Sequence, residues 1–146
     1  MSIVLKRELL WIPFFGWGMA LASPIAIDRS AGKSALKRIV EQGKARIAQG
    51  FWVLIFPEGT RTPPGQVGRY GIGGAWLATH TATPVLPVAL NAGEVWPKQA
   101  FLKRPGVITV SIGAVISSQG KKPDALNEEV RQWIETEMSR LPHARR

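Results

Sequence analysis

The sequence predicts an α/β fold, because short apolar runs typical of strands alternate along the chain with longer segments of helical spacing. Proline, glycine and polar residues bound these runs, as they usually bound strands. The hydrophobic content of 45% and the charged content of 20% are those of a folded chain, and 146 residues suffice for one domain. We therefore expect a single domain that spans residues 1–146.

Strands are predicted where β-branched and aromatic residues cluster, at residues 3–5, 24–28, 52–56, 85–90 and 107–112. The run at 52–56, Trp-Val-Leu-Ile-Phe, is apolar throughout, so we expect it to be buried. The run at 107–112 alternates apolar and polar residues, which predicts a half-buried strand.

Helices are predicted at residues 31–49, 72–81 and 123–141. Ser30 is a suitable N-cap for the first of them, and Pro123 suits the first turn of the last. The first helix carries an apolar stripe on one side and lysine and arginine residues on the other. We interpret its basic side as a solvated face, although an anionic membrane surface could also use it.

Residues 9–27 carry no charge and approach the length of a membrane span. Proline and glycine interrupt the stretch, so a continuous helix across a bilayer is not expected. Two interpretations stay open. The stretch could form core helices joined at Gly16, or it could be a surface that enters the lipid interface, flanked by Lys6 and Arg7. The side chains that would then contact the membrane are Trp11, Phe14, Phe15 and Trp17.

The formal net charge of +9 suits anionic partners such as nucleic acid, anionic lipid or a phosphorylated small molecule. Nucleic acid is disfavoured, because the aromatic residues lie in apolar runs and are not interleaved with lysine and arginine. The chain contains no cysteine, which excludes disulfides, thiolate nucleophiles and cysteine-ligated metals.

The segment that follows the run at 52–56 has the strongest functional pattern. Residues 56–61 read Phe-Pro-Glu-Gly-Thr-Arg. Pro57 cannot extend a strand ladder and Gly59 tolerates positive φ, so Glu58 and Arg61 should lie together on a tight turn at a strand's carboxyl end. Ligands bind at that edge of α/β sheets, and an arginine there can bind a phosphate through two N–H groups. The alternative is a Glu–Arg pair that caps an ordinary loop.

This hexapeptide resembles the FPEGTR signature of glycerolipid acyltransferases, specifically the 1-acylglycerol-3-phosphate (lysophosphatidate) acyltransferase family. Residues 25–29 resemble the family's second block, an apolar strand that ends on an arginine. Residues 85–89 resemble its fourth block, an apolar strand with an internal proline. The resemblance extends from residue 4 to about 113, and it implies a mixed sheet flanked by helices.

The resemblance implies that Arg29 and Arg61 bind the phosphate of the acceptor, while Gly59 and Thr60 shape the turn and offer hydrogen-bond donors. It gives Glu58 a structural or substrate-positioning role. As a general base Glu58 is a poor candidate, because we expect Arg61 to lower the pKa of its carboxyl.

The sequence departs from the family pattern in one position of this region. A glycine, Gly71, follows Tyr70 where the family commonly has a lysine. One positive charge is thereby lost from the expected phosphate site, and Arg69 is the candidate to compensate.

The family's catalytic block, a histidine followed five positions later by an aspartate, has no counterpart in this sequence. Five positions after His80 stands Val85, and His143 appears too near the end of the chain to have a partner. We therefore assign no catalytic residue and expect the C-terminal part of the family fold, truncated at its N-terminus. His80 is expected to be satisfied within its own helix.

The resemblance implies a 1-acyl-sn-glycerol-3-phosphate O-acyltransferase of phospholipid biosynthesis, which transfers an acyl group from acyl-CoA or acyl carrier protein to lysophosphatidate and forms phosphatidic acid. The alternative is a catalytically inactive fragment that binds phospholipid or membrane. Neither a metal nor another cofactor is expected, and no nucleic-acid partner. The expected location is an anionic membrane surface, on the cytoplasmic face of the inner or plasma membrane.

Overall fold

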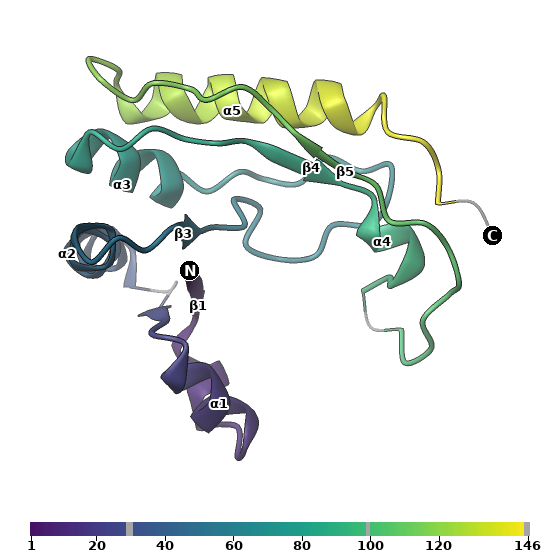
Figure 1. Ribbon diagram of the computed structural model, residues 1–146, viewed down its shortest axis with the longest axis horizontal. Helices are drawn as coiled ribbons and strands as arrows, with labels where there is room; N and C mark the ends of the chain where they lie inside the picture. The colour runs from purple at the N-terminus through teal and green to yellow at the C-terminus, as the bar shows by residue number, and fades with distance from the viewer. Residues whose placement is uncertain (29–30, 99, 145–146) are drawn as a thin grey trace. The chain divides into compact units, whose positions relative to one another are not determined.

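The computed structural model describes residues 1–28, 31–98 and 100–144. The chain divides into two compact units, Met1–Phe56 and Pro57–Arg146, which we call unit 1 and unit 2. Strands pair in parallel in unit 1 and antiparallel in unit 2, and helices accompany both sets of strands (Figure 1). The predicted mixed α/β class is thus confirmed, whereas the assignment of residues 1–146 to one domain stays a prediction.

Unit 1 is built on a parallel sheet of β1 (Ser2–Lys6), β2 (Ile25–Ile27) and β3 (Val53–Leu54), in the order β2-β1-β3. Val4 pairs with Ile25 on one side of β1, and Ile3 pairs with Leu54 on the other. The central strand is buried, as parallel strands usually are. The predicted burial of residues 52–56 is wrong at both ends, because β3 is a short edge strand and Trp52 and Phe56 are largely exposed.

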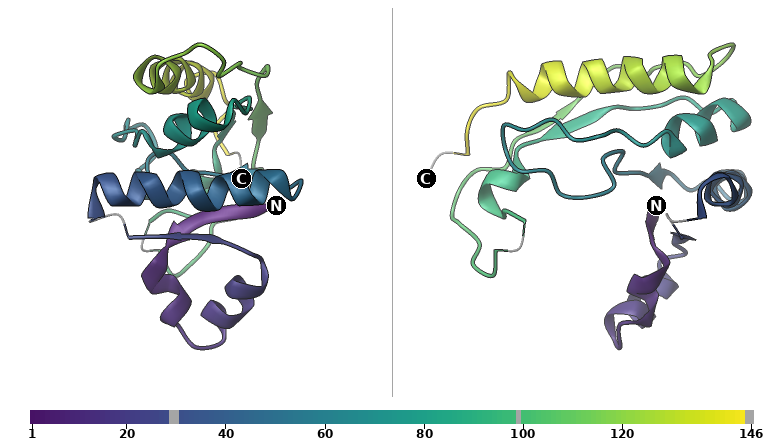
Figure 2. Two further views of the ribbon diagram at one scale, coloured as in Figure 1. Left: turned by 90° about the vertical axis from the view of Figure 1, so that its left-hand side faces the viewer. Right: turned by 180° about the vertical axis from the view of Figure 1, so that it is seen from behind.

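Helix α2 (Lys33–Ala48) contacts β2 and β3 through a buried side that includes Ala35 and Ile39 (Figure 2). It begins later than predicted, after Gly32 at φ 51°. The predicted cap, Ser30, lies outside the described residues.

The charge-free stretch begins inside a 3₁₀ helix, η1 (Arg7–Trp11), and continues through a short helix, α1 (Phe15–Leu21), which contacts η1. Between them the chain reverses in a γ-turn: Phe14 has φ 62° and ψ −53°, and the Phe15 N–H donates to the Pro13 carbonyl at 2.7 Å. A bulky residue in this region of φ carries strain of about 1–3 kcal/mol.

The predicted joint at Gly16 is therefore wrong by two positions. Gly16 lies inside α1, where a Cβ atom would come 2.1 Å from the Leu10 carbonyl oxygen. Only glycine lets η1 and α1 approach so closely. No helix within the described parts of the chain is long and apolar enough to cross a membrane.

Unit 2 contains α3 (Gly73–Thr81), β4 (Val88–Leu90), α4 (Ala92–Val95), β5 (Val110–Ile112) and α5 (Pro123–Met138). Strands β4 and β5 pair antiparallel, and α5 runs alongside them and α3 (Figure 1). The core gathers around fully buried Leu126 of α5, which packs with Ala75 and Ala78 of α3.

Strand β5 alternates as predicted, but its polar residue faces the interior and its apolar residues face solvent. Its central residue, Ser111, points toward α5 and donates to Glu137 at 2.7 Å, while Val110 and Ile112 are exposed. Glu137 of α5 is thus the partner of the polar residue in β5.

Candidate functional site

Residues 57–71 form a closed loop, which we call the signature loop because it carries the FPEGTR pattern. The Gly71 N–H donates to the Pro57 carbonyl at 2.8 Å and joins the two ends of the loop. Gly59 adopts φ 66°, which confirms the expected positive φ. A second turn places Gly65 at φ 79°, with the Gln66 N–H 3.1 Å from the Pro63 carbonyl oxygen, as a type II turn requires.

Glu58 lies inside this loop and organises it. Its carboxylate accepts a hydrogen bond from the Thr62 hydroxyl. A Cβ atom at position 68 would lie 2.6 Å from the Thr62 hydroxyl oxygen and 2.7 Å from Glu58 Oε2, so a larger residue there would displace these two side chains. The structure therefore supports the structural role that the resemblance implies for Glu58.

The expected effect of Arg61 on Glu58 is wrong in direction. Partial burial and the neighbouring negative charge of Glu135 raise the pKa of the Glu58 carboxyl above its ordinary value. Across the residues that the structure describes, Glu58 and Arg61 form no ion pair.

Tyr70 anchors the signature loop to α5. Its hydroxyl donates to Glu135 Oε1 at 2.7 Å. Partial burial and this hydrogen bond raise the pKa of the Tyr70 hydroxyl, so the group remains a donor at physiological pH. The anchor fixes the C-terminal end of the loop next to Gly71, the position where the family commonly has a lysine.

The Arg61 side chain is directed to Trp96, at the end of α4. The guanidinium carbon lies 4.6 Å from the centre of the Trp96 ring, and Lys103 Nζ lies 4.4 Å from the same ring. We call these three residues the cation cluster. The loop also passes close to α4, because a Cβ at Gly93 would lie 3.7 Å from the Pro64 ring.

The cation cluster carries positive charge that no carboxylate in the described ranges neutralises, since neither Arg61 nor Lys103 forms an ion pair there. A guanidinium that stacks on an indole keeps its N–H groups at the rim, where they can donate to an anion. Two cations beside one ring repel each other, and a bound anion removes that repulsion. The cluster is therefore suited to bind a phosphate or a carboxylate.

The sequence pattern did not identify Trp96 and Lys103 as site residues. They lie in a connection between strands that has no recognised motif, and only the fold brings them to Arg61. The available signal was weak: a tryptophan in a segment that holds several cations and no acidic residue from position 95 to 123.

The other predicted phosphate ligands are only partly placed. Thr60 is exposed, and Gly59 forms the turn between Glu58 and Thr60. Arg29 lies outside the described residues. A joint phosphate site of Arg29 and Arg61 therefore stays a prediction.

Both histidines have local partners. His80 stacks on Trp76 at 4.5 Å, and its Nδ1 lies 2.8 Å from the Trp76 carbonyl oxygen, which confirms that it is satisfied within its helix. His143 has no aspartate in the spacing of the family's catalytic block, but its Nδ1 lies 3.0 Å from Glu94 Oε1. The His143 side chain is 95% exposed, so this is a surface pair.

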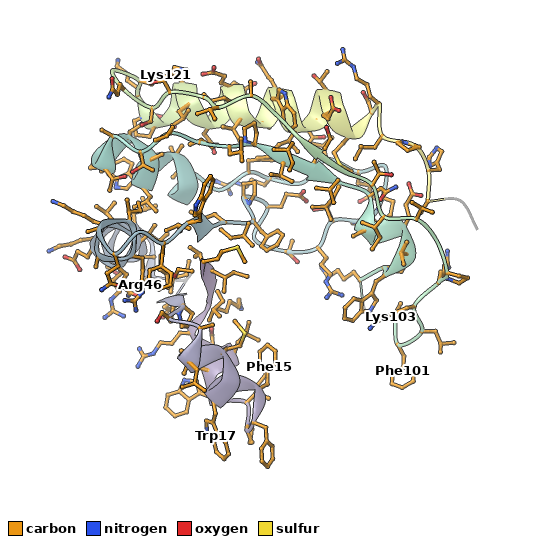
Figure 3. The ribbon with its side chains drawn as sticks, in the orientation of Figure 1. Phe15, Trp17, Arg46, Phe101, Lys103 and Lys121 are labelled. Carbon is orange, nitrogen blue, oxygen red and sulfur yellow. The ribbon has the colours of Figure 1, made fainter. Side chains whose placement is uncertain are left out.

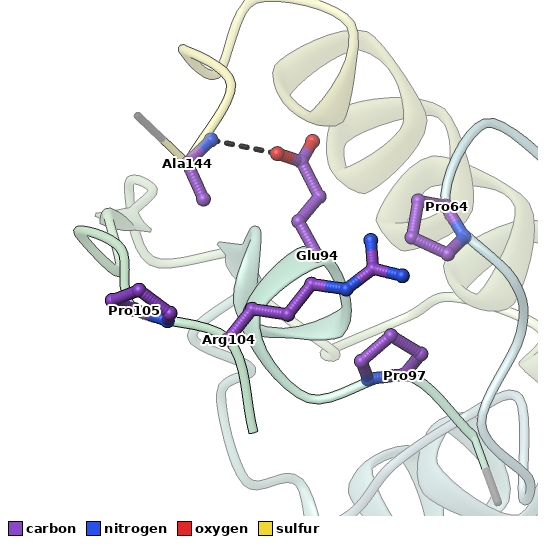
Figure 4. A pocket seen from close by; sticks show the side chains of 6 residues that line it. All are labelled: Pro64, Glu94, Pro97, Arg104, Pro105 and Ala144. Atoms are coloured by element: carbon purple, nitrogen blue, oxygen red, sulfur yellow. Dashed lines mark hydrogen bonds between the residues drawn. The ribbon is translucent and has the colours of Figure 1, made fainter. Parts of the chain in front are cut away.

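Glu94 also lines an open hollow of about 360 Å³ between α4 and the C-terminal segment (Figure 4). It accepts a hydrogen bond from the Ala144 N–H at 2.6 Å. This bond and the His143 bond lower the pKa of the Glu94 carboxyl. Arg104 extends into the same hollow beside Pro64 and Pro97 (Figure 4). In the described part of the chain, acidic and histidine residues form no cluster that could hold a metal ion.

The predicted membrane-contact residues are all exposed in unit 1. Trp11 is 76% exposed, Phe14 79% and Trp17 64%, and Phe15 is about half exposed. The Phe14 and Trp17 rings meet edge to face at 5.2 Å, and Trp17 points away from the ribbon of α1 (Figure 3). The core-helix interpretation of this stretch is therefore wrong for these four side chains.

Comparison with known proteins places these features in a family. Residues 1–91, more than half of the chain, match the family model described as Acyltransferase. The chain is 50% identical over 144 residues to the 1-acyl-sn-glycerol-3-phosphate acyltransferase of Pseudomonas aeruginosa, with 97% of this chain and 56% of that protein covered. It is 29% identical over 144 residues to the enzyme of the same name from Cocos nucifera, with 98% and 47% covered.

A solved structure supports the fold. The crystal structure of the 1-acyl-sn-glycerophosphate acyltransferase PlsC from Thermotoga maritima matches with a TM-score of 0.76 at 24% identity. The match covers 95% of this chain and 56% of that one.

The chain thus spans about half the length of the curated relatives it matches. The family model and the identity to the Pseudomonas aeruginosa protein cover the signature loop as well as the strands of unit 1. The chain belongs to the acyltransferase family.

Proposed function

We propose that the protein takes part in acylating 1-acyl-sn-glycerol-3-phosphate (lysophosphatidate), with acyl-CoA or acyl carrier protein as the donor and phosphatidic acid as the product. In this function the cation cluster binds the phosphate of the acceptor. The observation that carries the proposal is the Arg61 guanidinium, held on Trp96 beside Lys103 without a carboxylate partner in the described residues. The names of the relatives support the choice of substrate.

The proposed reaction is an attack of the free hydroxyl of the acceptor on the thioester carbonyl, with loss of a proton from the hydroxyl and departure of the thiol. The residues of this chain contribute binding and orientation. Arg61 and Lys103 hold the phosphate, so that the hydroxyl is presented to the thioester at a fixed distance from it. Arg29 is the proposed second guanidinium of the site. No proton transfer is assigned to His80 or His143.

We also propose that unit 1 contacts an anionic membrane, on the cytoplasmic face of the inner or plasma membrane. The exposed aromatic residues of η1 and α1 support this contact, together with exposed Lys6 and Arg7 next to them. The strain at Phe14 points the same way, because strained backbone is retained mainly where it serves a function.

The test separates binding from catalysis. The 146-residue chain is titrated with a short-chain lysophosphatidate and with the matching monoacylglycerol, which lacks the phosphate. We expect binding to depend on the phosphate. Equal affinity for the two acceptors would overturn the assignment of the cation cluster.

Catalysis is then measured as transfer of a labelled acyl group from acyl-CoA and from acyl carrier protein. The chain is compared with a longer form that carries a histidine–aspartate block ahead of residue 1. We expect transfer in the longer form. Phosphate-dependent binding without transfer in either form would instead establish the inactive lipid-binding alternative.

A further inference from the structure

We propose that unit 2 has its own membrane contact, in which Phe101 and Leu102 insert into the interface of an anionic bilayer. We call these two residues the apolar tip. The proposal rests on the proposed membrane association of the protein, but the two inserted residues belong neither to the family pattern nor to the cation cluster, from which only Lys103 is shared.

The apolar tip is the most exposed pair of large apolar residues in unit 2. Phe101 is 98% exposed and Leu102 is 77% exposed. Figure 3 shows Phe101 at the outer end of its loop, directed away from the ribbon of α4. Large apolar side chains presented together to solvent indicate an interaction surface.

The loop that carries the tip is held in shape by hydrogen bonds on both sides. The Arg104 N–H donates to the Val95 carbonyl at 2.8 Å and closes the base of the loop. The Trp96 indole N–H donates to the Ala100 carbonyl at 3.2 Å, and the Ala100 N–H donates to the Pro97 carbonyl at 3.2 Å. The tip is therefore presented by a braced loop, which lowers the entropy cost of ordering it on binding.

The charged residues next to the tip indicate which kind of partner it contacts. Lys98, Lys103 and Arg104 flank the tip in the sequence and are exposed, and the chain has no aspartate or glutamate from position 95 to 123. Lys103 is also held close to the loop by its contact with Trp96. Apolar side chains flanked by several cations and no acids match the interface of an anionic membrane, where the apolar groups enter the acyl boundary and the cations meet the headgroups.

The size of the tip also favours a membrane over a protein partner. A stable protein interface buries about 800 Å² on each side, far more than two side chains supply. A bilayer makes no such demand, because it offers a continuous apolar layer to any side chain that reaches it. A second copy of the chain and a soluble partner are thus the competing occupants that the test must exclude.

The absence of cysteine from the sequence permits a site-specific test in the full chain. A single cysteine is introduced by Phe101→Cys and labelled with an environment-sensitive fluorophore. The matched control is Val115→Cys, another exposed apolar position of unit 2, and Phe14→Cys reports on the surface of unit 1. Each labelled protein is mixed with phosphatidylcholine vesicles, with and without phosphatidylglycerol.

We expect the label at position 101 to brighten and shift to shorter wavelength with the anionic vesicles, while the label at position 115 stays unchanged. High salt should weaken the response, because it screens the cations around the tip. A response at position 14 without one at position 101 would overturn the membrane contact of unit 2 and leave that of unit 1 standing. No fluorescence change at either position would overturn the proposed membrane association of both units. A response at 101 that grows with protein concentration in the absence of lipid would assign the tip to self-association and overturn the proposal.

A second measurement uses co-sedimentation with the anionic vesicles. The variant Phe101→Ser/Leu102→Ser should lower the partition coefficient by roughly tenfold, because two large apolar groups no longer leave water. Leu102→Ser and Val115→Ser form a matched pair of single replacements, of which only the first should weaken binding. Equal partition of the wild type and the double variant would contradict the proposal.

Discussion

The two units use tryptophan side chains in different ways. In unit 1, Trp11 and Trp17 are exposed to solvent within a stretch that carries no charge. In unit 2, Trp76 and Trp96 each carry a basic side chain on the ring, His80 on the first and Arg61 with Lys103 on the second. The same residue type thus presents an apolar surface in one unit and positions charge in the other. The basic side chain that the fold places on the ring, rather than the aromatic residue itself, distinguishes the two uses.

The largest expected effect comes from removing the charge that Trp96 holds. Arg61→Ala should weaken the affinity for short-chain lysophosphatidate by roughly thirtyfold, about 2 kcal/mol, because a charged hydrogen-bonding group is lost from the phosphate site. In an active longer form the acceptor KM should rise. Titration calorimetry measures the affinity. The control is Arg140→Ala, an exposed arginine of unit 2 outside the signature loop, for which we expect a change within about twofold. Similar losses in both variants would mean that the cluster has no special role.

The next effect concerns unit 1 alone. Phe14→Ser/Trp17→Ser should reduce partition onto anionic vesicles by roughly tenfold, because the apolar surface that enters the interface is lost. The affinity for soluble lysophosphatidate should not change. Co-sedimentation measures the partition, and Trp52→Ser is the control, since Trp52 is also exposed in unit 1 but lies at β3. If the control weakened binding as much as the double variant, exposure alone would explain the result.

A smaller effect is expected where the signature loop is anchored. Tyr70→Phe removes the 2.7 Å hydrogen bond to Glu135 and should lower the stability of unit 2 by about 1 kcal/mol. Urea denaturation measures the loss in the free energy of unfolding, and amide hydrogen exchange in α5 measures the loss locally. Glu135→Gln keeps an acceptor for the tyrosine, so it should cost less. A larger loss for Glu135→Gln would show that charge, not the hydrogen bond, anchors the loop.

The smallest effect tests the carboxylate inside the loop. The pKa of Glu58 is raised in the folded protein by partial burial and by Glu135, so the folded state binds the proton more tightly than the unfolded state does. The stabilisation that this provides is fully present below the unfolded pKa and is lost as pH rises through the folded pKa. Glu58→Gln should therefore be more stable than the wild type near neutral pH and equal to it in acid. A pH series of thermal melts measures the difference in stability. If the wild type instead became more stable relative to the variant as pH rises, the raised pKa of Glu58 would be contradicted.

Much of the fold could be predicted from the sequence, because its signals are local. Helical spacing located α2, α3 and α5, and the β-branched runs located β1, β2 and β4 to within a few residues. The turn at Gly59 was predictable because positive φ is a property of the residue itself. The family assignment also followed from residues that are contiguous in the chain.

The errors about which side chains meet concern residues far apart in the sequence. The pKa of Glu58 depends on Glu135 of α5, and the orientation of Arg61 depends on Trp96, so neither follows from the hexapeptide alone. The outward face of β5 likewise depends on Glu137, which gives Ser111 a partner on the inner side. Local pattern can predict an element, but it cannot predict which distant side chain the element meets.

The γ-turn at Phe14 has a consequence for any attempt to make the protein more robust. Glycine at this position would adopt the same φ without steric penalty, so Phe14→Gly should relieve the strain in the folded state. It would also delete the most exposed aromatic ring of the turn. A search that selects variants by heat resistance alone would therefore tend to favour proteins without the proposed membrane contact of unit 1.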